Sequence, residues 1–199
     1  WDAVDRYNRR IGASAGRGAY SEAIEAGRIL DGCRDKLKRL LSVTDASRLI
    51  FTFNATDAIN LGIKGVVRPG DHVLDVGCGT GRHAHELARR GIGVHGIDIS
   101  QRFVEIAQSN APDGATFERG DARMLRFHEE FDAVICLCQG AFGMMTADGE
   151  DAAVVAGMAA ALRPDGRLAL SAFNAYFAVK YHEDADFDAA TGVSHERTE

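Results

Sequence analysis

The chain has 199 residues, of which 46% are hydrophobic and 26% are charged, and it contains only 3 prolines. This length and composition can bury the core of one ordinary domain or two small ones, which excludes a disordered tail and a fibrous repeat. The longest largely apolar stretch, residues 152–162, is shorter than the roughly 20 residues that cross a bilayer. No secretion signal opens the chain. We therefore expect no membrane association.

The formal net charge of -6 conceals an uneven distribution, because residues 1–70 hold 12 Lys and Arg against 8 Asp and Glu, whereas residues 71–199 hold 11 against 21. The acidic surplus of the larger part opposes binding to nucleic-acid phosphates, so no nucleic-acid partner is expected. The cysteines favour reduced thiols and a cytoplasmic location. No Cys or His set has complete metal-ligand spacing, so no metal site is expected. The cysteines are Cys33, Cys78, Cys136 and Cys138.

The first seventy residues are expected to form an α-β-α segment, because apolar residues recur first at helical spacing and then in a short run. Ser21 is the expected cap of the first helix, and either Asn54 or Thr56 caps the second. An Arg-Pro-Gly-Asp turn at residues 68–71 ends the segment. The expected elements are a helix over residues 21–41, a strand over residues 49–53 and a helix that ends near residue 64.

After this turn, short apolar strands alternate with helical stretches, which is typical of βαβ units and a parallel sheet. Right-handed crossovers place helices on both faces of such a sheet. The predicted fold is therefore α/β, a Rossmann-like doubly wound parallel sheet with an N-terminal α-β-α extension. Strands are expected near residues 73–76, 93–98, 115–119, 131–138 and 167–173, and helices near 81–90, 100–109 and 149–162.

A glycine-rich turn follows the first of these strands, where residues 73–81 read Val-Leu-Asp-Val-Gly-Cys-Gly-Thr-Gly. Glycine allows a tight turn and the close approach of a ligand, which is expected to meet N–H groups at the start of the next helix. The dinucleotide-binding fingerprint would need another glycine at the position of Arg82. The spacing therefore disfavours a dinucleotide.

Acidic residues stand at three successive strand ends: Asp75, Asp98 and Asp121. They are expected to face one crevice. There Asp98 can accept hydrogen bonds from ribose hydroxyls, and Asp121 can accept a hydrogen bond from an adenine amino group. So much negative charge suits an adenosine ligand with a cationic tail better than a pyrophosphate.

Residues 71–199 resemble the class I S-adenosylmethionine-dependent methyltransferases. The matching motifs are residues 75–81, Gly-Ile-Asp-Ile-Ser at 96–100, Gly-Asp-Ala at 120–122, Phe-Asp-Ala-Val at 131–134 and Leu-Arg-Pro-Asp-Gly at 162–166. The resemblance implies S-adenosylmethionine as cofactor, with its methionine part at the glycine-rich turn, its ribose at Asp98 and its adenine at Asp121. The cofactor-binding residues that it implies are Asp75, Val76, Gly77, Cys78, Gly79, Thr80, Gly81, Asp98, Ile99, Asp121, Ala122 and Cys138.

Cys138 is expected at the end of the fourth strand, on the same face as Cys136 and beside the transferable methyl group. The sequence Cys-Gln-Gly-Ala at residues 138–141 lacks the motifs that the methyltransferases of nucleic-acid bases carry there. The resemblance therefore implies a small-molecule or protein acceptor. Residues 171–177 are either an acceptor wall or ordinary aromatic packing. No catalytic base can be assigned, an oligomer is left open, and His83 and His85 are interpreted as surface residues.

Residues 1–70 resemble a different family, the class V aminotransferases and cysteine desulfurases. The resemblance rests on residues 16–20 and 49–61, where Ala55-Thr56 matches a contact to the phosphate of pyridoxal phosphate. A Schiff-base lysine has no counterpart, because no lysine has that family's surroundings. The lysines are Lys36, Lys38, Lys64 and Lys180.

The expected domains are thus residues 1–70, similar to an aminotransferase, and residues 71–199, a methyltransferase domain. The chain is expected to be a chimera whose second domain is incomplete, because few residues follow the fifth strand. A small-molecule methyltransferase is the leading hypothesis. The alternatives are a pyridoxal-phosphate enzyme fragment and a nonfunctional chimera.

Overall fold

The computed structural model describes residues 2–138, 140–143, 149–172, 186–188 and 193–195. The chain divides into two compact units, Trp1–Phe53 and Asn54–Glu199. Each unit is described by itself below.

The first unit contains helix α1 (Asp2–Arg10), helix α2 (Ser21–Leu40) and a 3₁₀ turn, η1 (Ala46–Arg48). The strand predicted over residues 49–53 is wrong, because no neighbouring strand pairs with this apolar run in the described part of the unit. Arg34 holds the run instead: its Nε donates to the carbonyl of Leu49 at 3.3 Å, and its guanidinium lies 5.3 Å from the ring centroid of Phe51. Ser21 is the first helical residue rather than the cap, which is Tyr20.

The second unit is built on a five-stranded parallel sheet in the order β3-β2-β1-β4-β5. The strands β2 and β3 agree with the prediction. Strand β4 ends two residues earlier than predicted. Strand β5 begins earlier, at Leu162, because the residues of the Leu-Arg-Pro-Asp-Gly motif join it, with a shift in its register against β4. The strands are β1 (His72–Val76), β2 (Gly93–Asp98), β3 (Ala115–Arg119), β4 (Phe131–Cys136) and β5 (Leu162–Leu170).

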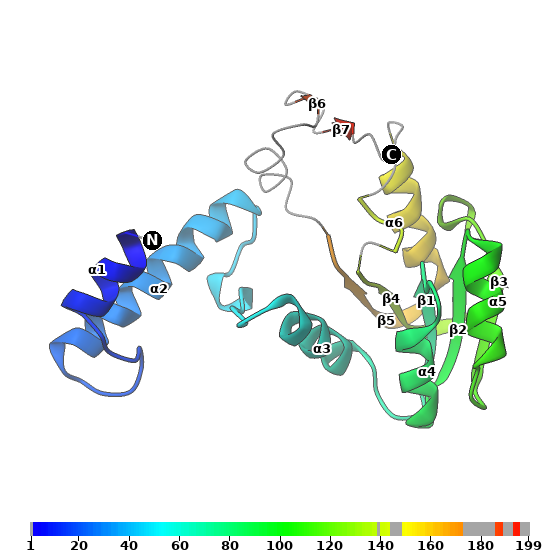
Figure 1. Cartoon of the computed structure of the whole chain (residues 1–199), viewed down its shortest axis with the longest axis horizontal. Coiled ribbons are helices and arrows are strands. Elements are labelled where there is room, and N and C mark those ends of the chain that lie inside the picture. The colour runs from blue at the N-terminus through cyan, green and yellow to red at the C-terminus, as the bar shows by residue number, and fades with distance from the viewer. Residues whose placement is uncertain (1, 139, 144–148, 173–185, 189–192, 196–199) are drawn as a thin grey trace. The chain divides into compact units, whose positions relative to one another are not determined.

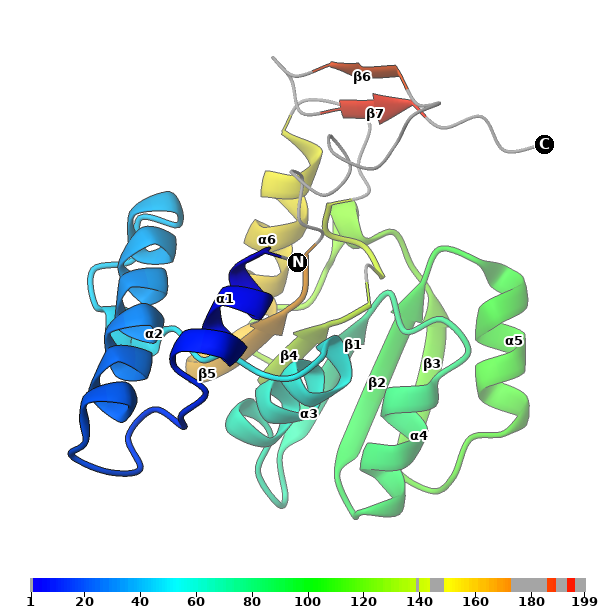
Figure 2. The same cartoon turned by 60° about the vertical axis from the view of Figure 1, so that its left-hand side comes forward.

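Helices cover both faces of this sheet, as predicted (Figures 1 and 2). On one face lie α3 (Ala55–Val66), α4 (Arg82–Arg89) and α5 (Gln101–Ser109), which pack on one cluster of buried side chains. On the other face, α6 (Glu150–Ala161) packs with the short turn η2 (Ala122–Met124) on a second cluster. The result is a three-layer α/β architecture.

Helix α3 belongs to the second unit, although the motifs placed the boundary at residue 70. Its half-buried Ile59, Ile63 and Val66 pack on the core beneath α4 and α5, and Gly62 lies close to Ala169 of β5. Asn54 caps the helix by accepting the N–H of Asp57 at 2.8 Å. The structural boundary therefore falls between Phe53 and Asn54.

A separate two-stranded antiparallel pair is formed by β6 (Asp186–Asp188) and β7 (Val193–His195). Among the described residues, no helix is both long and apolar enough to cross a membrane.

We expect that a chain starting at Asn54 is more stable than one starting at Asp71, because the shorter chain lacks α3. Losing the half-buried Ile59, Ile63 and Val66 should cost about 1 kcal/mol each, which lowers Tm by about 6–12 °C in a unit of this size. Thermal unfolding followed by circular dichroism measures the difference. Equal Tm values for the two chains would contradict the packing of α3 on this core.

Candidate functional site

The glycine-rich turn between β1 and α4 is fastened to the end of β2. The N–H groups of Gly77 and Cys78 both donate to the carbonyl of Ile97 at 2.9 Å, and the N–H of Gly79 donates to Oδ2 of Asp98 at 2.8 Å. These three amides are therefore already engaged within the protein. An anion at this part of the turn would find its three donors used.

Two glycines of this turn, Gly77 and Gly79, are required for different physical reasons. Gly77 has φ +71°, and a Cβ there would lie 2.2 Å from the backbone of Gly140, so a side chain cannot fit. Gly79 has φ +57°, but a Cβ there would face open space. Close approach of two backbone segments thus constrains Gly77, whereas Gly79 is constrained by its conformation alone.

Asp98 ends β2 and is 9% exposed. Its Oδ2 accepts the N–H of Gly79, and its Oδ1 accepts the N–H of Ser100, each at 2.8 Å. An ionised carboxylate has about four acceptor positions, so each oxygen keeps the capacity to accept a further donor. The two backbone bonds fix the carboxylate in place.

Asp75 lies inside β1 rather than at its end, and it is 1% exposed. Its Oδ2 has no hydrogen-bond partner among the described residues. Burial first and the charge of Asp98 second raise the pKa of Asp75 to about 7, against an opposing effect of Arg82. This buried acid is therefore easily protonated unless a cation comes near it.

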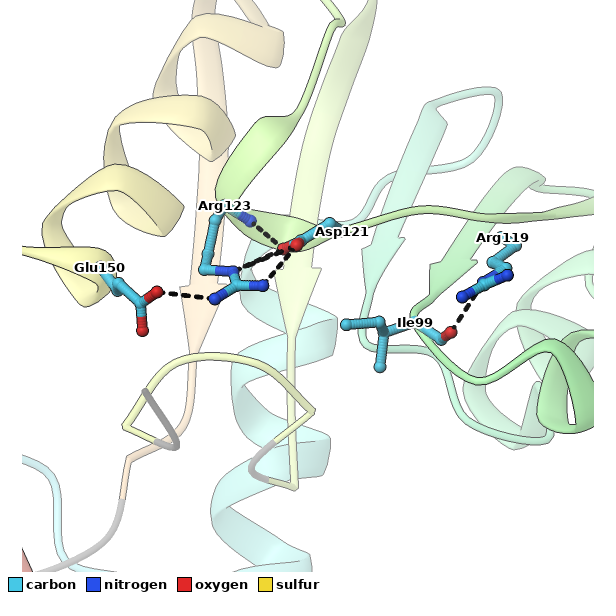
Figure 3. Close-up of polar contacts among 5 residues, drawn as sticks. All are labelled: Ile99, Arg119, Asp121, Arg123 and Glu150. Carbon is cyan, nitrogen blue, oxygen red and sulfur yellow. Dashed lines mark hydrogen bonds and ion pairs between the residues drawn. The ribbon is translucent and has the colours of Figure 1, made fainter. Parts of the chain in front are cut away.

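Asp121 follows β3 and caps η2, where it accepts the N–H of Arg123 at 2.9 Å. The guanidinium of Arg123 also binds both carboxylate oxygens of Asp121 and reaches Glu150 at the start of α6 (Figure 3). These contacts hold the pKa of Asp121 below its ordinary value. Arg123 thus joins the end of β3 to α6.

A cavity of about 270 Å³ opens beside these carboxylates. It brings together Asp98 and Asp121, as expected, but Asp75 does not line it. The lining residues are Gly77, Ile97, Asp98, Ile99, Gly120, Asp121, Ala122, Arg123, Gly140, Ala141 and Glu150.

The other residues that the sequence singled out do not line the cavity. Val76 is fully buried, and burial raises the pKa of the Cys78 thiol to about 12. Gly79, Thr80 and Gly81 form the rest of the turn, and Gly81 adopts a left-handed conformation at the start of α4.

Cys138 does not end β4, because the strand stops at Cys136 and the chain then turns. Cys138 adopts a positive φ of 54°, its N–H donates to Oγ of Ser171 at 2.7 Å, and its Sγ contacts the guanidinium of Arg82. Cys136 is buried in the core cluster of α6, whereas Cys138 packs against the opposite cluster. The two thiols therefore do not share a face.

The sequence analysis missed Arg123, Glu150 and Gly140, which reach the cavity from segments outside the motifs. It was also wrong about His85, which is 7% exposed and whose Nε2 lies 2.9 Å from the carbonyl of Ala107. The buried face of α4 could have indicated this, since His85 stands beside Ala84 on a helix with a strongly apolar side. The described residues contain no group of His, Cys, Asp and Glu side chains placed to hold a metal ion. Residues 173–177 of the expected acceptor wall lie outside the described part of the chain.

Comparison with known proteins finds two families. Residues 73–166 match the methyltransferase domain family, and residues 1–103 match the class V aminotransferases. The second match covers about half of the chain, which therefore belongs to the class V aminotransferase family over its first half. Residues 73–166 are similar to the methyltransferase domain family. The two matches share residues 73–103.

Relatives of the second part are methyltransferases. A ubiquinone biosynthesis O-methyltransferase from Coxiella burnetii is 29% identical over 112 residues, covering 54% of this chain and 46% of that protein. A demethylmenaquinone methyltransferase from Beutenbergia cavernae is 37% identical over 111 residues, covering 54% and 42%. The chain thus spans less than half the length of these curated relatives.

A similar solved structure is that of CalS10 from Micromonospora echinaspora, an amino pentose methyltransferase with S-adenosylmethionine bound. It superposes with a TM-score of 0.51 at 28% identity, and the match covers 64% of this chain and 59% of that one. The likeness supports the Rossmann-like methyltransferase fold.

We expect the titration of Asp75 to make the protein less stable as pH rises. Its folded pKa of about 7 exceeds the ordinary value of 3.8, so between these values the unfolded chain loses a proton that the folded chain keeps, and stability falls until about pH 7. From pH 5 to pH 8 the loss should be about 2–3 kcal/mol. Urea unfolding of the wild type and Asp75→Asn at both pH values measures it. The same pH dependence in both proteins would contradict the shifted pKa.

We expect Gly77→Ala to disrupt the turn and Gly79→Ala to be milder. The new Cβ at residue 77 would overlap the backbone of Gly140, whereas at residue 79 it meets open space. The Gly79 variant carries only the strain of a positive φ, about 1 kcal/mol, and the Gly77 variant should lose at least twice as much. Chemical unfolding of both variants provides the comparison. A Gly77→Ala protein as stable as Gly79→Ala would show that the two segments are not in close contact.

Proposed function

We propose that this chain binds S-adenosylmethionine in the cavity at the ends of β2 and β3 and transfers its methyl group to a small-molecule acceptor. The observation that carries the proposal is that Asp98 and Asp121 share one cavity beside a glycine-rich turn in which the amides of Gly77, Cys78 and Gly79 are already used. The site therefore offers hydrogen-bond acceptors and negative charge. A nucleoside with a cationic tail has the matching donors and charge, whereas a pyrophosphate does not.

The residues present fit this cofactor. Asp98 keeps free acceptor capacity for the two ribose hydroxyls. Asp121 lies in the same cavity, where the adenine amino group would have to compete with the hydrogen bonds that Arg123 already donates to both of its oxygens. Ile99, which is 60% exposed, and Ala122 supply apolar contacts at the cavity wall. Asp75 does not line the cavity, but its buried Oδ2 has no hydrogen-bond partner among the described residues, and a cationic methionine part near the turn would favour its ionised form. The remaining turn residues, from Val76 to Gly81, and Cys138 would complete the binding site around the cavity.

When bound, S-adenosylmethionine supplies a methyl group activated by its positively charged sulfur. The work left to the chain is to hold the nucleoside in one orientation and to align the acceptor with it, and such alignment can supply much of the rate enhancement. Asp98 is well suited to the first task, because two backbone N–H groups fix both of its oxygens. No side chain is assigned here as a general base.

A small molecule is the acceptor class that the chain supports best. The relatives' names include a ubiquinone biosynthesis O-methyltransferase and an amino pentose methyltransferase. The net negative charge of residues 71–199 opposes a nucleic-acid acceptor. We propose a cytoplasmic location, because the cysteines of this chain favour reduced thiols.

Pyridoxal-phosphate chemistry is a second candidate because residues 1–103 match the class V aminotransferases. The local structure supports it less well. Thr56 is exposed, and Asn54 already caps the helix start where the phosphate would bind. Neither Lys36 nor Lys64 is buried, whereas a Schiff-base lysine is commonly activated by desolvation. Lys180 lies outside the described residues.

Calorimetric titration with S-adenosylmethionine and S-adenosylhomocysteine tests the proposal. Binding of both is expected, with Asp98→Asn weakening it by about 1.5–3 kcal/mol because hydrogen bonds to a charged group are lost. Asp113→Asn, an exposed change remote from the cavity residues, serves as the matched control and should bind normally. NADH should not compete, and pyridoxal phosphate should form no borohydride-reducible adduct. Unchanged affinity in Asp98→Asn, or competition by NADH, would overturn the assignment.

A further inference from the structure

Asp75 is a buried acid with one carboxylate oxygen that the fold leaves without a partner. The residue is 1% exposed, and its Oδ2 has no hydrogen-bond partner among the described residues. Within the sheet it is paired with Gly96 of β2 and Ile135 of β4, neither of which has a side chain that offers a charge or a hydrogen bond. Buried polar groups in native proteins are nearly always hydrogen-bonded. The packing of the sheet therefore does not account for an acid at this position.

The charges on either side of Asp75 oppose each other. Asp98, at the end of β2, adds a negative charge, and Arg82, the first residue of α4, adds a positive one. The guanidinium of Arg82 is engaged elsewhere, because its Nη2 lies 2.6 Å from Sγ of Cys138. Arg82 therefore acts on Oδ2 of Asp75 by its charge and not by a hydrogen bond.

The other titratable groups around Asp75 lie on the turn, on β4 and on α4. Burial raises the pKa of Cys78 on the turn to about 12 and also raises the pKa of Cys136 at the end of β4, so both thiols stay protonated at neutral pH. His83 follows Arg82 on α4, and burial together with the charge of Arg82 lowers its pKa. Asp75 itself, with a pKa raised to about 7, changes its charge in the neutral range.

We infer that Asp75 is a specificity-determining residue, which releases a proton when S-adenosylmethionine binds and thereby makes the site distinguish this cation from S-adenosylhomocysteine. The inference rests on the proposed function and gives the same site a dependence on pH. The two ligands differ by one methyl group and by the positive charge of the sulfur. A cation near the turn favours the ionised form of Asp75, and the ionised form favours the cation to the same extent, because the two effects are reciprocal. The proton that Asp75 loses passes to the solvent.

The direction of the pH dependence follows from this linkage. At low pH Asp75 is protonated with either ligand bound, so the charge of the sulfur gains nothing from it. The affinity for S-adenosylmethionine should then rise with pH and level off above the pKa of the free protein, about 7. An opposite charge lowers the pKa of a nearby carboxyl by about 1–3. Asp75 does not line the cavity, so we take the lower figure, which corresponds to about tenfold in affinity.

The test measures both ligands across the neutral range. Isothermal titration calorimetry gives the dissociation constants of S-adenosylmethionine and S-adenosylhomocysteine from pH 5.5 to pH 8 for the wild type, Asp75→Asn and Arg82→Met. Repeating the titrations at pH 6.5 in two buffers of different ionisation enthalpy counts the protons released. Asp113→Asn, at an exposed acid that does not line the cavity, is the matched control. Circular dichroism shows whether each variant is folded.

The ratio of the two affinities isolates Asp75 from other effects. Contacts that both ligands share cancel in the ratio. Asp75→Asn has nearly the shape of the protonated acid but cannot ionise, and it leaves His83 and the titration of the ligands themselves unchanged. Any pH dependence that the wild type shows beyond that of Asp75→Asn therefore belongs to Asp75.

Between pH 5.5 and pH 8, the preference of the wild type for S-adenosylmethionine should increase about tenfold more than that of Asp75→Asn. At pH 6.5 the wild type should release about 0.5 proton more with S-adenosylmethionine than with S-adenosylhomocysteine, and Asp75→Asn should lose this excess. Arg82→Met removes the opposing charge, so the midpoint of the increase should move to higher pH. Asp113→Asn should behave like the wild type.

The same pH dependence of the ratio in the wild type and Asp75→Asn overturns the inference. If Asp75→Asn does not fold, the other proteins decide: equal proton release with the two ligands in the wild type, or an unmoved midpoint in Arg82→Met, overturns it. A wild type that binds both ligands with a ratio independent of pH overturns the inference but leaves the proposed function in place. A wild type that binds neither ligand overturns the proposed function, and the inference with it.

Discussion

The attachment of the glycine-rich turn to the end of β2 is the constraint on which the site depends. The carbonyl of Ile97 accepts hydrogen bonds from two N–H groups of the turn, and the carboxylate of Asp98 accepts one from a third. Through these bonds, one strand end shapes the turn, uses three of its N–H donors and holds Asp98 in place. The close approach of Gly77 to Gly140 then brings the segment after β4 against the same turn. Cavity shape and carboxylate geometry therefore have a common origin.

The same attachment determines the charge of the site. Two backbone donors hold the carboxylate of Asp98 in place. Burial first and the charge of Asp98 second raise the pKa of the neighbouring Asp75 to about 7. The positive charge of Arg82 opposes this rise in pKa. The guanidinium of Arg82, however, contacts Cys138, and Oδ2 of Asp75 has no hydrogen-bond partner among the described residues. Further anionic charge would be costly there, whereas a cation would be stabilised. Electrostatics thus agrees with the hydrogen bonding in disfavouring a pyrophosphate.

The sequence was most informative where one pattern is local and was least informative where distant segments meet. Strands β2 and β3 were predicted to the residue, because short apolar runs stand between clear turn and helix signals. Residues 49–53 looked similar but have no strand to pair with in the described unit, and a run of apolar residues carries no information about its partner. Asp98 and Asp121 were found because strand ends meet at one edge of a parallel sheet. Arg123 and Glu150 were missed because their contact joins segments 27 residues apart.

The overlap of the two family matches at residues 73–103 has a structural explanation. Both families carry a turn similar to Pro-Gly-Asp before a strand, and such a turn is a local pattern. The pairing of these strands is not local: β1 lies between β2 and β4, and β2 lies between β1 and β3. Both strands therefore have both edges filled by the sheet that continues through the methyltransferase match. Helix α3, which precedes the turn, packs on that same sheet. The overlapping residues thus belong structurally to the methyltransferase part of the chain, whatever their local similarity to the aminotransferases.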